Sequence, residues 1–294
     1  PFDVPPGANQ PVYVEFHIPP GTRPGEYRGA IEVTSEPAVP FAVIPVSVRV
    51  RRFTLPAASS LHTAFQSYDS DYRLGPAAYY GYRYGGPRHV ALATAIDEML
   101  IAHRLMPEAP MGFRIEPDDL DPEGNLRLTR ARAAHLLSLL KRPEFTDYSL
   151  SFANKYPFDL DIPGNRRLAV NYLRSVYEWF RSYGIQQKLF IRPGDEPATR
   201  QQFQEIRELA GLARAAHPEF RVGMTIDFHD RRTAQFLYGN VNRLIALYGS
   251  FDPAEAAARR LAGDEIWTYT ALVQNRDVPS PHWEIDFPLL NYRV

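Results

Sequence analysis

Residues 188–203 read KLFIRPGDEPATRQQF, and this stretch decides the fold. The run from Lys188 to Arg192 is short and mostly apolar, and a Pro-Gly pair ends it, as is typical of a buried strand. Thr199 and Gln202 have the spacing of a capping box, which predicts a helix over Arg200–His217. A strand followed at once by a helix is the repeating unit of α/β proteins with a parallel sheet.

The same alternation extends outward along the chain. The expected strands are Leu61–Gln66, Gly112–Ile115, Tyr148–Ala153, Lys188–Arg192, Arg221–Ile226, Arg243–Leu247 and Glu265–Tyr269. The expected helices include Arg88–His103, Arg130–Leu140, Arg167–Arg181 and Arg200–His217. The seven strand–helix units occupy about 240 residues, and a complete (β/α)8 barrel has roughly 250 residues. We therefore expect a TIM-like barrel over residues 53–294, truncated so that its eighth unit lies beyond Val294. A doubly wound open sheet is the alternative.

Residues 1–52 have the period of β structure. Apolar and polar residues alternate from Val12 to Ile18, and residues 27–34 and 41–50 supply two more β-branched runs. Three strands offer too little inner face for a closed core, so we interpret this segment as the C-terminal part of a β-sandwich domain. Its other strands would precede Pro1. Because the chain begins at Pro rather than Met and stops abruptly, we expect a piece of a longer protein.

Composition excludes several classes of function. The 294 residues include 33 Lys and Arg, 34 Asp and Glu, and no Cys, for a net charge of −1. A nucleic-acid partner would need a basic footprint, so none is expected. No apolar run approaches the ~18 residues of a membrane span, so no membrane partner is expected. The absence of Cys excludes disulfides, thiolate metal sites and cysteine nucleophiles.

The common cofactor and metal motifs are also absent. The chain has no glycine-rich nucleotide-binding motif, no HExxH and no GxSxG, so no cofactor is expected. Asp227 and His229 resemble a ligand pair, but two ligands do not make a metal site, so no metal is expected.

Paired carboxylates remain as candidate catalytic groups. Three Asp-Glu dipeptides occur, of which residues 97–98 lie in an expected helix as a solvated face and residues 264–265 precede a strand. Asp195 and Glu196 instead follow a strand directly, at the end that is catalytic in a barrel. A glycine before the pair and a proline after it break the strand, so both carboxylates can turn toward one pocket. The alternative is that the two acids cap the next helix.

Aromatic and polar side chains at other strand ends suit a sugar. Trp267 and Tyr269 lie at the end of the seventh expected strand, and Asn154 follows the third. Aromatic rings with polar handles fit a ligand that has apolar ring faces and hydroxyl edges. We expect these residues, with Asp227 and His229 after the fifth strand, to contact the substrate.

Together these features resemble glycoside hydrolase family 123 and its DUF4091 relatives, over nearly the whole chain and in the same order. The segments that carry the resemblance are Gln10–Val14, Ile18–Gly29, Phe53–Pro56, His103-Arg104, Gly194–Pro197, Trp267–Tyr269, Ser280-Pro281, Ile285–Pro288 and Arg293. The resemblance implies a secreted or periplasmic β-N-acetylgalactosaminidase-like glycoside hydrolase. Its carbohydrate substrate would be a terminal 2-acetamido-2-deoxy-β-hexoside, hydrolysed with retention and substrate assistance, outside the usual two-carboxylate scheme.

The resemblance also implies roles for the acidic pair. Glu196 would be the general acid/base, and Asp195 would orient the 2-acetamido group of the substrate. Two alternatives remain open. One is a glycosidase acting on a sugar without an acetamido group, for which Asp227 is the first candidate as a third carboxylate. The other is a carbohydrate-binding or structural module without catalysis.

Overall fold

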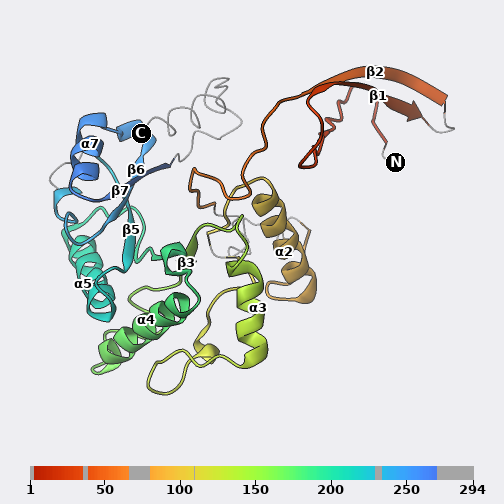
Figure 1. The fold of residues 1–294 in the computed structure, drawn as a ribbon. Coiled ribbons are helices and arrows are strands. Elements are labelled where there is room, and N and C mark those ends of the chain that lie inside the picture. Colours follow the sequence, from red (N-terminus) through yellow and green to blue (C-terminus); the bar gives the residue numbers. More distant parts are fainter. Residues whose placement is uncertain (1–2, 36–38, 66–79, 109, 229–233, 270–294) are drawn as a thin grey trace. The chain divides into compact units, whose positions relative to one another are not determined.

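The computed structural model describes residues 3–35, 39–65, 80–108, 110–228 and 234–269. The chain divides into two compact units, Pro1–Ala57 and Ala58–Val294. In the first unit, β1 (Gly25–Ser35) and β2 (Val39–Val50) form an antiparallel hairpin (Figure 1). The register pairs Gly25 with Val50, and a bulge falls between Val33 and Thr34.

Of the three strands expected here as the C-terminal part of a β-sandwich, two are found among the described residues of this unit. These residues contain the single two-stranded sheet, and the strand predicted from Val12 to Ile18 is wrong. Alternation makes a strand only where a neighbour can accept its backbone hydrogen bonds. Within the described part of the unit, no backbone hydrogen bond joins residues 12–18 to β1 or β2. The apolar residues of this segment are accordingly exposed, Val12 to 67%.

The second unit is built on a five-stranded parallel sheet whose strands follow one another in chain order. Its strands are β3 (Tyr148–Leu150), β4 (Leu189–Ile191), β5 (Arg221–Ile226), β6 (Arg243–Leu247) and β7 (Glu265–Tyr269). The helices are α2 (Pro87–Ala102), α3 (Arg130–Leu140), α4 (Asn165–Ser182), α5 (Arg200–Ala216) and α7 (Pro253–Leu261). Short 3-10 turns cover Pro117–Asp119, Gln186–Lys188 and Tyr248–Ser250.

The TIM-like barrel prediction is corrected by this sheet, because the described residues of the second unit form five strands and no closed barrel. The expected strand Leu61–Gln66 is reduced to one bridge between Phe65 and Pro107, and Gln66 lies outside the described residues. A barrel closes only when its first and last strands pair, and no such pairing joins β3 to β7. The described architecture is therefore a mixed α/β fold.

The expected strand Gly112–Ile115 fails for a visible reason. Its backbone groups bond to side chains rather than to a neighbouring strand. The Tyr148 hydroxyl donates to the Phe113 carbonyl at 2.9 Å and accepts from the Ile115 N–H at 3.1 Å. Arg132 of α3 donates to the Gly112 carbonyl at 2.9 Å. A sequence pattern cannot reveal this competition, because both partners are distant in the chain.

The element that carries the acidic pair folds as its local sequence predicts. β4 is fully buried, and the capping box at the start of α5 is confirmed. The Thr199 hydroxyl accepts from the Gln202 N–H at 3.2 Å, and the Gln202 side chain accepts from the Thr199 N–H at 2.9 Å. The turn between β4 and α5 is thus held at both ends.

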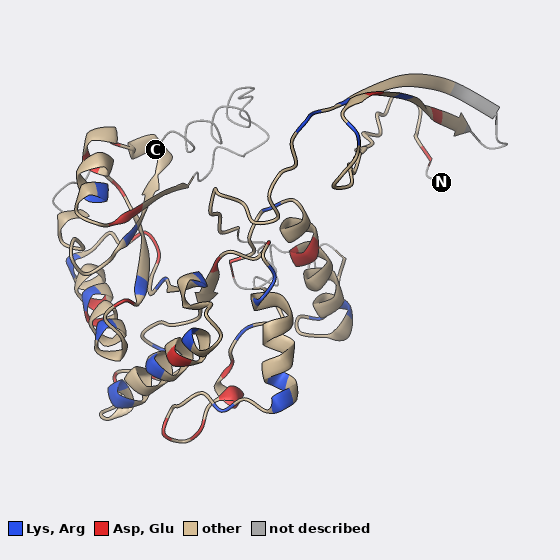
Figure 2. Cartoon of the chain, in the orientation of Figure 1, with Lys and Arg blue, Asp and Glu red and all other residues tan. Residues whose placement is uncertain are grey.

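Apolar stripes of α4 and α5 pack into the core around the sheet, with Leu173 and Ala210 fully buried. Figure 2 shows that Lys, Arg, Asp and Glu are interspersed along both helices. Among the described helices, none is both long and apolar enough to cross a bilayer.

Candidate active site

The acidic pair lies at the carboxyl edge of the parallel sheet. Asp195 and Glu196 follow β4, Thr225 is near the end of the neighbouring strand β5, and Tyr269 ends β7. Because parallel strands point the same way, their carboxyl ends share one edge, where ligands of α/β proteins usually bind. Hydrogen bonds join these residues into one cluster.

Asp195 is anchored through one of its two carboxylate oxygens. Its Oδ1 accepts from Nη1 of Arg192 at 2.6 Å and from the Thr225 hydroxyl at 3.1 Å. The side chain is still 64% exposed. Within the described part of the chain, Oδ2 makes no protein hydrogen bond, so it can accept one from a ligand.

Glu196 is held by its backbone and by its side chain. Its N–H donates to the Thr225 hydroxyl at 2.6 Å, and the Tyr269 hydroxyl donates to its Oε1. Its φ of +39° lies in the left-handed region, which an L-residue adopts only when its surroundings enforce it. Both carboxylates are exposed, so a ligand can reach them.

Arg192 connects the pair to a more distant carboxylate. Its Nε donates to Glu108 Oε1 at 2.7 Å and its Nη2 to Glu108 Oε2 at 3.2 Å, the two-pronged geometry that a guanidinium favours. Burial alone would lower the pKa of Arg192, but the charges of Glu108 and Asp195 outweigh it and raise that pKa. Arg192 therefore stays a fixed cation behind Asp195.

Tyr269 remains a hydrogen-bond donor at all moderate pH values. Burial, the hydrogen bond to Glu196 and the negative charges of Glu196, Asp195 and Asp227 raise the pKa of its hydroxyl well above 10. Asp227 therefore lies close enough for its field to reach this hydroxyl. The cluster combines one carboxylate with a free oxygen, one carboxylate held by a phenol, and a cation behind them. This set can transfer a proton and stabilise a developing positive charge.

The other residues expected at the site are placed differently. The ring of Trp267 packs on the Arg243 guanidinium at 4.3 Å and lies 6.2 Å from the ring of Phe190. Asn154 lies in the loop after β3, where its backbone carbonyl accepts the Leu160 N–H at 2.9 Å. His229 lies outside the described residues. Contact of these residues with a substrate stays a prediction.

Three residues of the cluster were not singled out from sequence: Glu108, Arg192 and Thr225. Arg192 had a signal, since a charged residue ends an otherwise apolar strand. Thr225 had almost none, because a β-branched residue in a strand suggests packing alone. Elsewhere, Asp97 was expected to be solvated but is 5% exposed and accepts the Met111 N–H at 3.0 Å. That buried hydrogen bond replaces the water it would otherwise need.

A second charged cluster lies at the opposite, amino edge of the sheet. Arg243, at the start of β6, is 1% exposed and pairs with Glu265 at 2.8 Å and with Asp147 at 3.2 Å. The Asp147 contact joins Arg243 Nη2 to Asp147 Oδ1 as an ion pair without hydrogen-bond geometry, since Oδ1 has no hydrogen-bond partner among the described residues. The other oxygen of Asp147 is 2.6 Å from Nδ1 of His62. This cluster belongs to the core and not to the candidate site.

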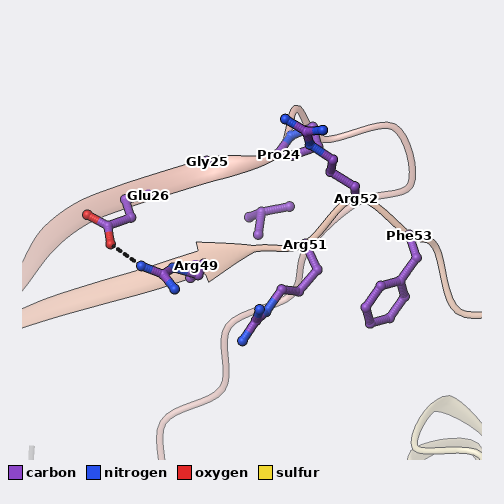
Figure 3. A pocket seen from close by; sticks show the side chains of 8 residues that line it. Pro24, Gly25, Glu26, Arg49, Arg51, Arg52 and Phe53 are labelled. Carbon is purple, nitrogen blue, oxygen red and sulfur yellow. Dashed lines mark hydrogen bonds and ion pairs between the residues drawn. The ribbon is translucent and has the colours of Figure 1, made fainter.

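The first unit has an open hollow of about 600 Å³ at the base of its hairpin (Figure 3). It is lined by Pro24, Gly25, Glu26, Arg49, Val50, Arg51, Arg52 and Phe53. Arg49 and Glu26 pair across it at 3.0 Å. It brings no two carboxylates together, so it does not offer the same chemistry. Among the described residues, no three His, Asp or Glu side chains are grouped to hold a metal ion.

Comparison with known proteins relates this fold to a glycoside hydrolase. No protein-family model matches the chain, and no curated protein sequence matches it. The structure is similar to that of a family 123 glycoside hydrolase from Clostridium perfringens, whose structural analysis addressed glycolipid glycan hydrolysis. The TM-score is 0.52 at 14% identity, with 88% of this chain and 52% of the other covered. This chain therefore spans about half the length of that glycoside hydrolase, and at this identity the likeness is one of fold.

Proposed function

We propose that this protein is a glycoside hydrolase that removes terminal 2-acetamido-2-deoxy-β-hexosides, N-acetylgalactosamine foremost, with retention at the anomeric carbon. The fold similarity to a family 123 glycoside hydrolase supports the general class. The observation that carries the proposal is the Asp195–Glu196 pair itself. Its two carboxylates are consecutive in the chain, exposed, and held by different partners.

The first step forms an internal bond in the substrate. Asp195 Oδ2 accepts a hydrogen bond from the N–H of the 2-acetamido group. This bond turns the carbonyl oxygen of the acetamido group toward the anomeric carbon. That oxygen attacks the carbon while the glycosidic C–O bond breaks, and protonated Glu196 gives its proton to the leaving oxygen. The products are an alcohol, a carboxylate at Glu196 and a cyclic oxazolinium ion, whose positive charge faces Asp195.

The second step reverses the roles. The Glu196 carboxylate takes a proton from water as the water oxygen attacks the anomeric carbon from the vacated face. The bond to the acetamido oxygen breaks, and the amide is restored. Two displacements at one carbon retain its configuration. Arg192 and Thr225 hold Asp195 throughout, so it needs no reorientation as charge develops.

The test is hydrolysis of aryl β-glycosides by the full-length protein. The panel pairs 4-nitrophenyl 2-acetamido-2-deoxy sugars with their 2-hydroxy counterparts, for the galacto and gluco series. We expect turnover of the acetamido sugars alone. On an alkyl acetamido glycoside added to the panel, whose poor leaving group needs a general acid, Glu196→Gln should lower turnover by about 10²–10⁴-fold. Asp195→Asn should lose turnover while still folding, because the substituted amide keeps the shape of the carboxylate.

A second candidate is a glycosidase for sugars without the acetamido group, in which Asp227 serves as a third carboxylate. Asp227 directly follows β5, at the edge of the sheet where the pair lies, and its charge adds to the raised pKa of Tyr269. Turnover of the 2-hydroxy sugars that is lost in Asp227→Asn would favour this candidate over substrate assistance. Sugar binding without any turnover would favour a module that is not catalytic.

A further inference from the structure

One hydroxyl group contacts both members of the acidic pair. Thr225 Oγ1 donates its only hydrogen to Asp195 Oδ1 at 3.1 Å and accepts the N–H of Glu196 at 2.6 Å. A threonine hydroxyl has one donor and two acceptor positions, so these two bonds are compatible. Thr225 is 5% exposed and sits on the buried strand β5, which fixes the position of its oxygen.

The turn that carries the pair packs directly on this strand. A Cβ added at Gly194 would lie 3.4 Å from the Ile206 side chain of α5 and 3.6 Å from that of Met224 on β5. The turn is therefore enclosed between β5 and α5 just before the two carboxylates. Thr225 is the next residue along β5 and contacts the turn where its backbone changes direction.

The backbone of Glu196 needs such a contact. A φ of +39° is unfavourable for a residue with a β-carbon, and it persists only when other interactions enforce it. The Glu196 N–H has no helical or strand partner and bonds to the Thr225 hydroxyl instead. Packing alone does not require that hydroxyl, since valine has nearly the same shape.

We infer that Thr225 is a positioning residue, whose hydroxyl sets the spacing and direction of Asp195 and Glu196 for catalysis. The bond to Asp195 holds Oδ1 on the protein side and leaves Oδ2 for the ligand. The bond to Glu196 keeps its backbone in the left-handed conformation, from which the side chain reaches the Tyr269 hydroxyl. The role of Thr225 in catalysis rests on the proposed function, whereas its effect on the positions of Asp195 and Glu196 does not.

The experiment compares three variants of the full-length protein. Thr225→Val removes the hydroxyl and keeps the shape, and Thr225→Ser keeps the hydroxyl. Thr146→Val is the matched control, because the buried Thr146 hydroxyl has no hydrogen-bond partner among the described residues. Crystal structures of the wild type and all variants give the φ of Glu196, and steady-state kinetics on the aryl acetamido glycoside give kcat and KM.

In Thr225→Val we expect the φ of Glu196 to leave the left-handed region. We also expect the Asp195 carboxylate to turn away from Arg192. We expect kcat to fall by about 10–100-fold, the loss of a hydrogen bond to a charged group, with KM changing much less. Thr225→Ser should restore most of kcat, and Thr146→Val should leave it unchanged.

An unmoved turn in Thr225→Val would overturn the inference, whether or not the protein hydrolyses the substrate. A Thr225→Val variant that is less stable but has an unchanged kcat would also overturn the inference. A wild type without turnover would count against the proposed function alone, and the crystal structures would then still decide the role of Thr225. If Thr225→Val does not fold, Thr225→Ala with the same two readouts replaces it.

Discussion

Glu108 and Arg192 are 84 positions apart in the chain, yet they form a two-pronged ion pair with N–O distances of 2.7 and 3.2 Å. Neither side chain is more than 17% exposed. Arg192 uses its remaining nitrogen to hold Asp195, so Glu108 acts on the candidate site through Arg192. The exposed carboxylate of Asp195 is therefore oriented, through Arg192, by the largely buried carboxylate of Glu108.

The first prediction concerns this ion pair. Glu108→Gln removes a charge from a largely buried pair, so we expect the free energy of unfolding to fall by about 1–3 kcal/mol. Urea unfolding measures it. The matched control is Glu208→Gln, which breaks the exposed pair of Glu208 with Arg166 at 2.9 Å and should lower stability by less than ~1 kcal/mol. Equal losses in the two variants would contradict the prediction.

The second prediction concerns the phenol that holds Glu196. Tyr269→Phe should lower kcat by about tenfold or more on a substrate with a poor leaving group, because Glu196 loses the donor that orients it. Tyr238→Phe is the control, since the Tyr238 hydroxyl donates to Glu255 at 2.8 Å in an equivalent pair away from the site. A kcat that falls equally in both variants would show a general effect on folding rather than on Glu196.

The third prediction concerns pH and His62. Its hydrogen bond to Asp147 raises the pKa of His62 above 6.5, against the opposing effects of burial and the positive charge of Arg243, and Glu265 adds to the increase. A histidine with a raised folded pKa stabilises the fold fully below its unfolded pKa, and this contribution is lost as pH rises through the folded pKa.

The stability difference between wild type and His62→Gln should therefore be larger at about pH 5.5 than at about pH 8.5. Urea unfolding of both proteins at both pH values measures it. A difference that does not change between the two would mean that the Asp147 contact does not depend on the charge of His62.

The fourth prediction concerns the buried cation at the amino edge of the sheet. The Arg243 guanidinium packs on the rings of Phe190 and Trp267, at 4.4 and 4.3 Å. Arg243→Met should lower stability by about 3–5 kcal/mol, because it removes the buried cation that Asp147 and Glu265 share. Arg221→Met is the control, because Arg221 pairs with the same Glu265 at 3.2 Å but is 32% exposed. It should lower stability by less than ~1 kcal/mol, and denaturant midpoints separate the two.

Local sequence patterns located most elements of the second unit. The strands Arg221–Ile226, Arg243–Leu247 and Glu265–Tyr269 have the bounds that their apolar runs predict. Helix α7 was not predicted, although Asp252 caps it through the N–H groups of Ala254 and Glu255. These features depend on residues within about four positions of one another, which is why sequence alone can reveal them.

The sequence also determined where the acidic pair lies, because a strand, a Gly break and a capped helix around it are all local. Which partners it has was decided by the tertiary structure, since Thr225 and Tyr269 are 29 and 73 positions from Glu196. Strand order and register bring those residues together, and no periodicity encodes that distance. The tertiary structure likewise decided how many strands the sheet has. The segment expected as a second strand gave its backbone hydrogen bonds to Tyr148 and Arg132, so the described fold has five parallel strands rather than a closed barrel.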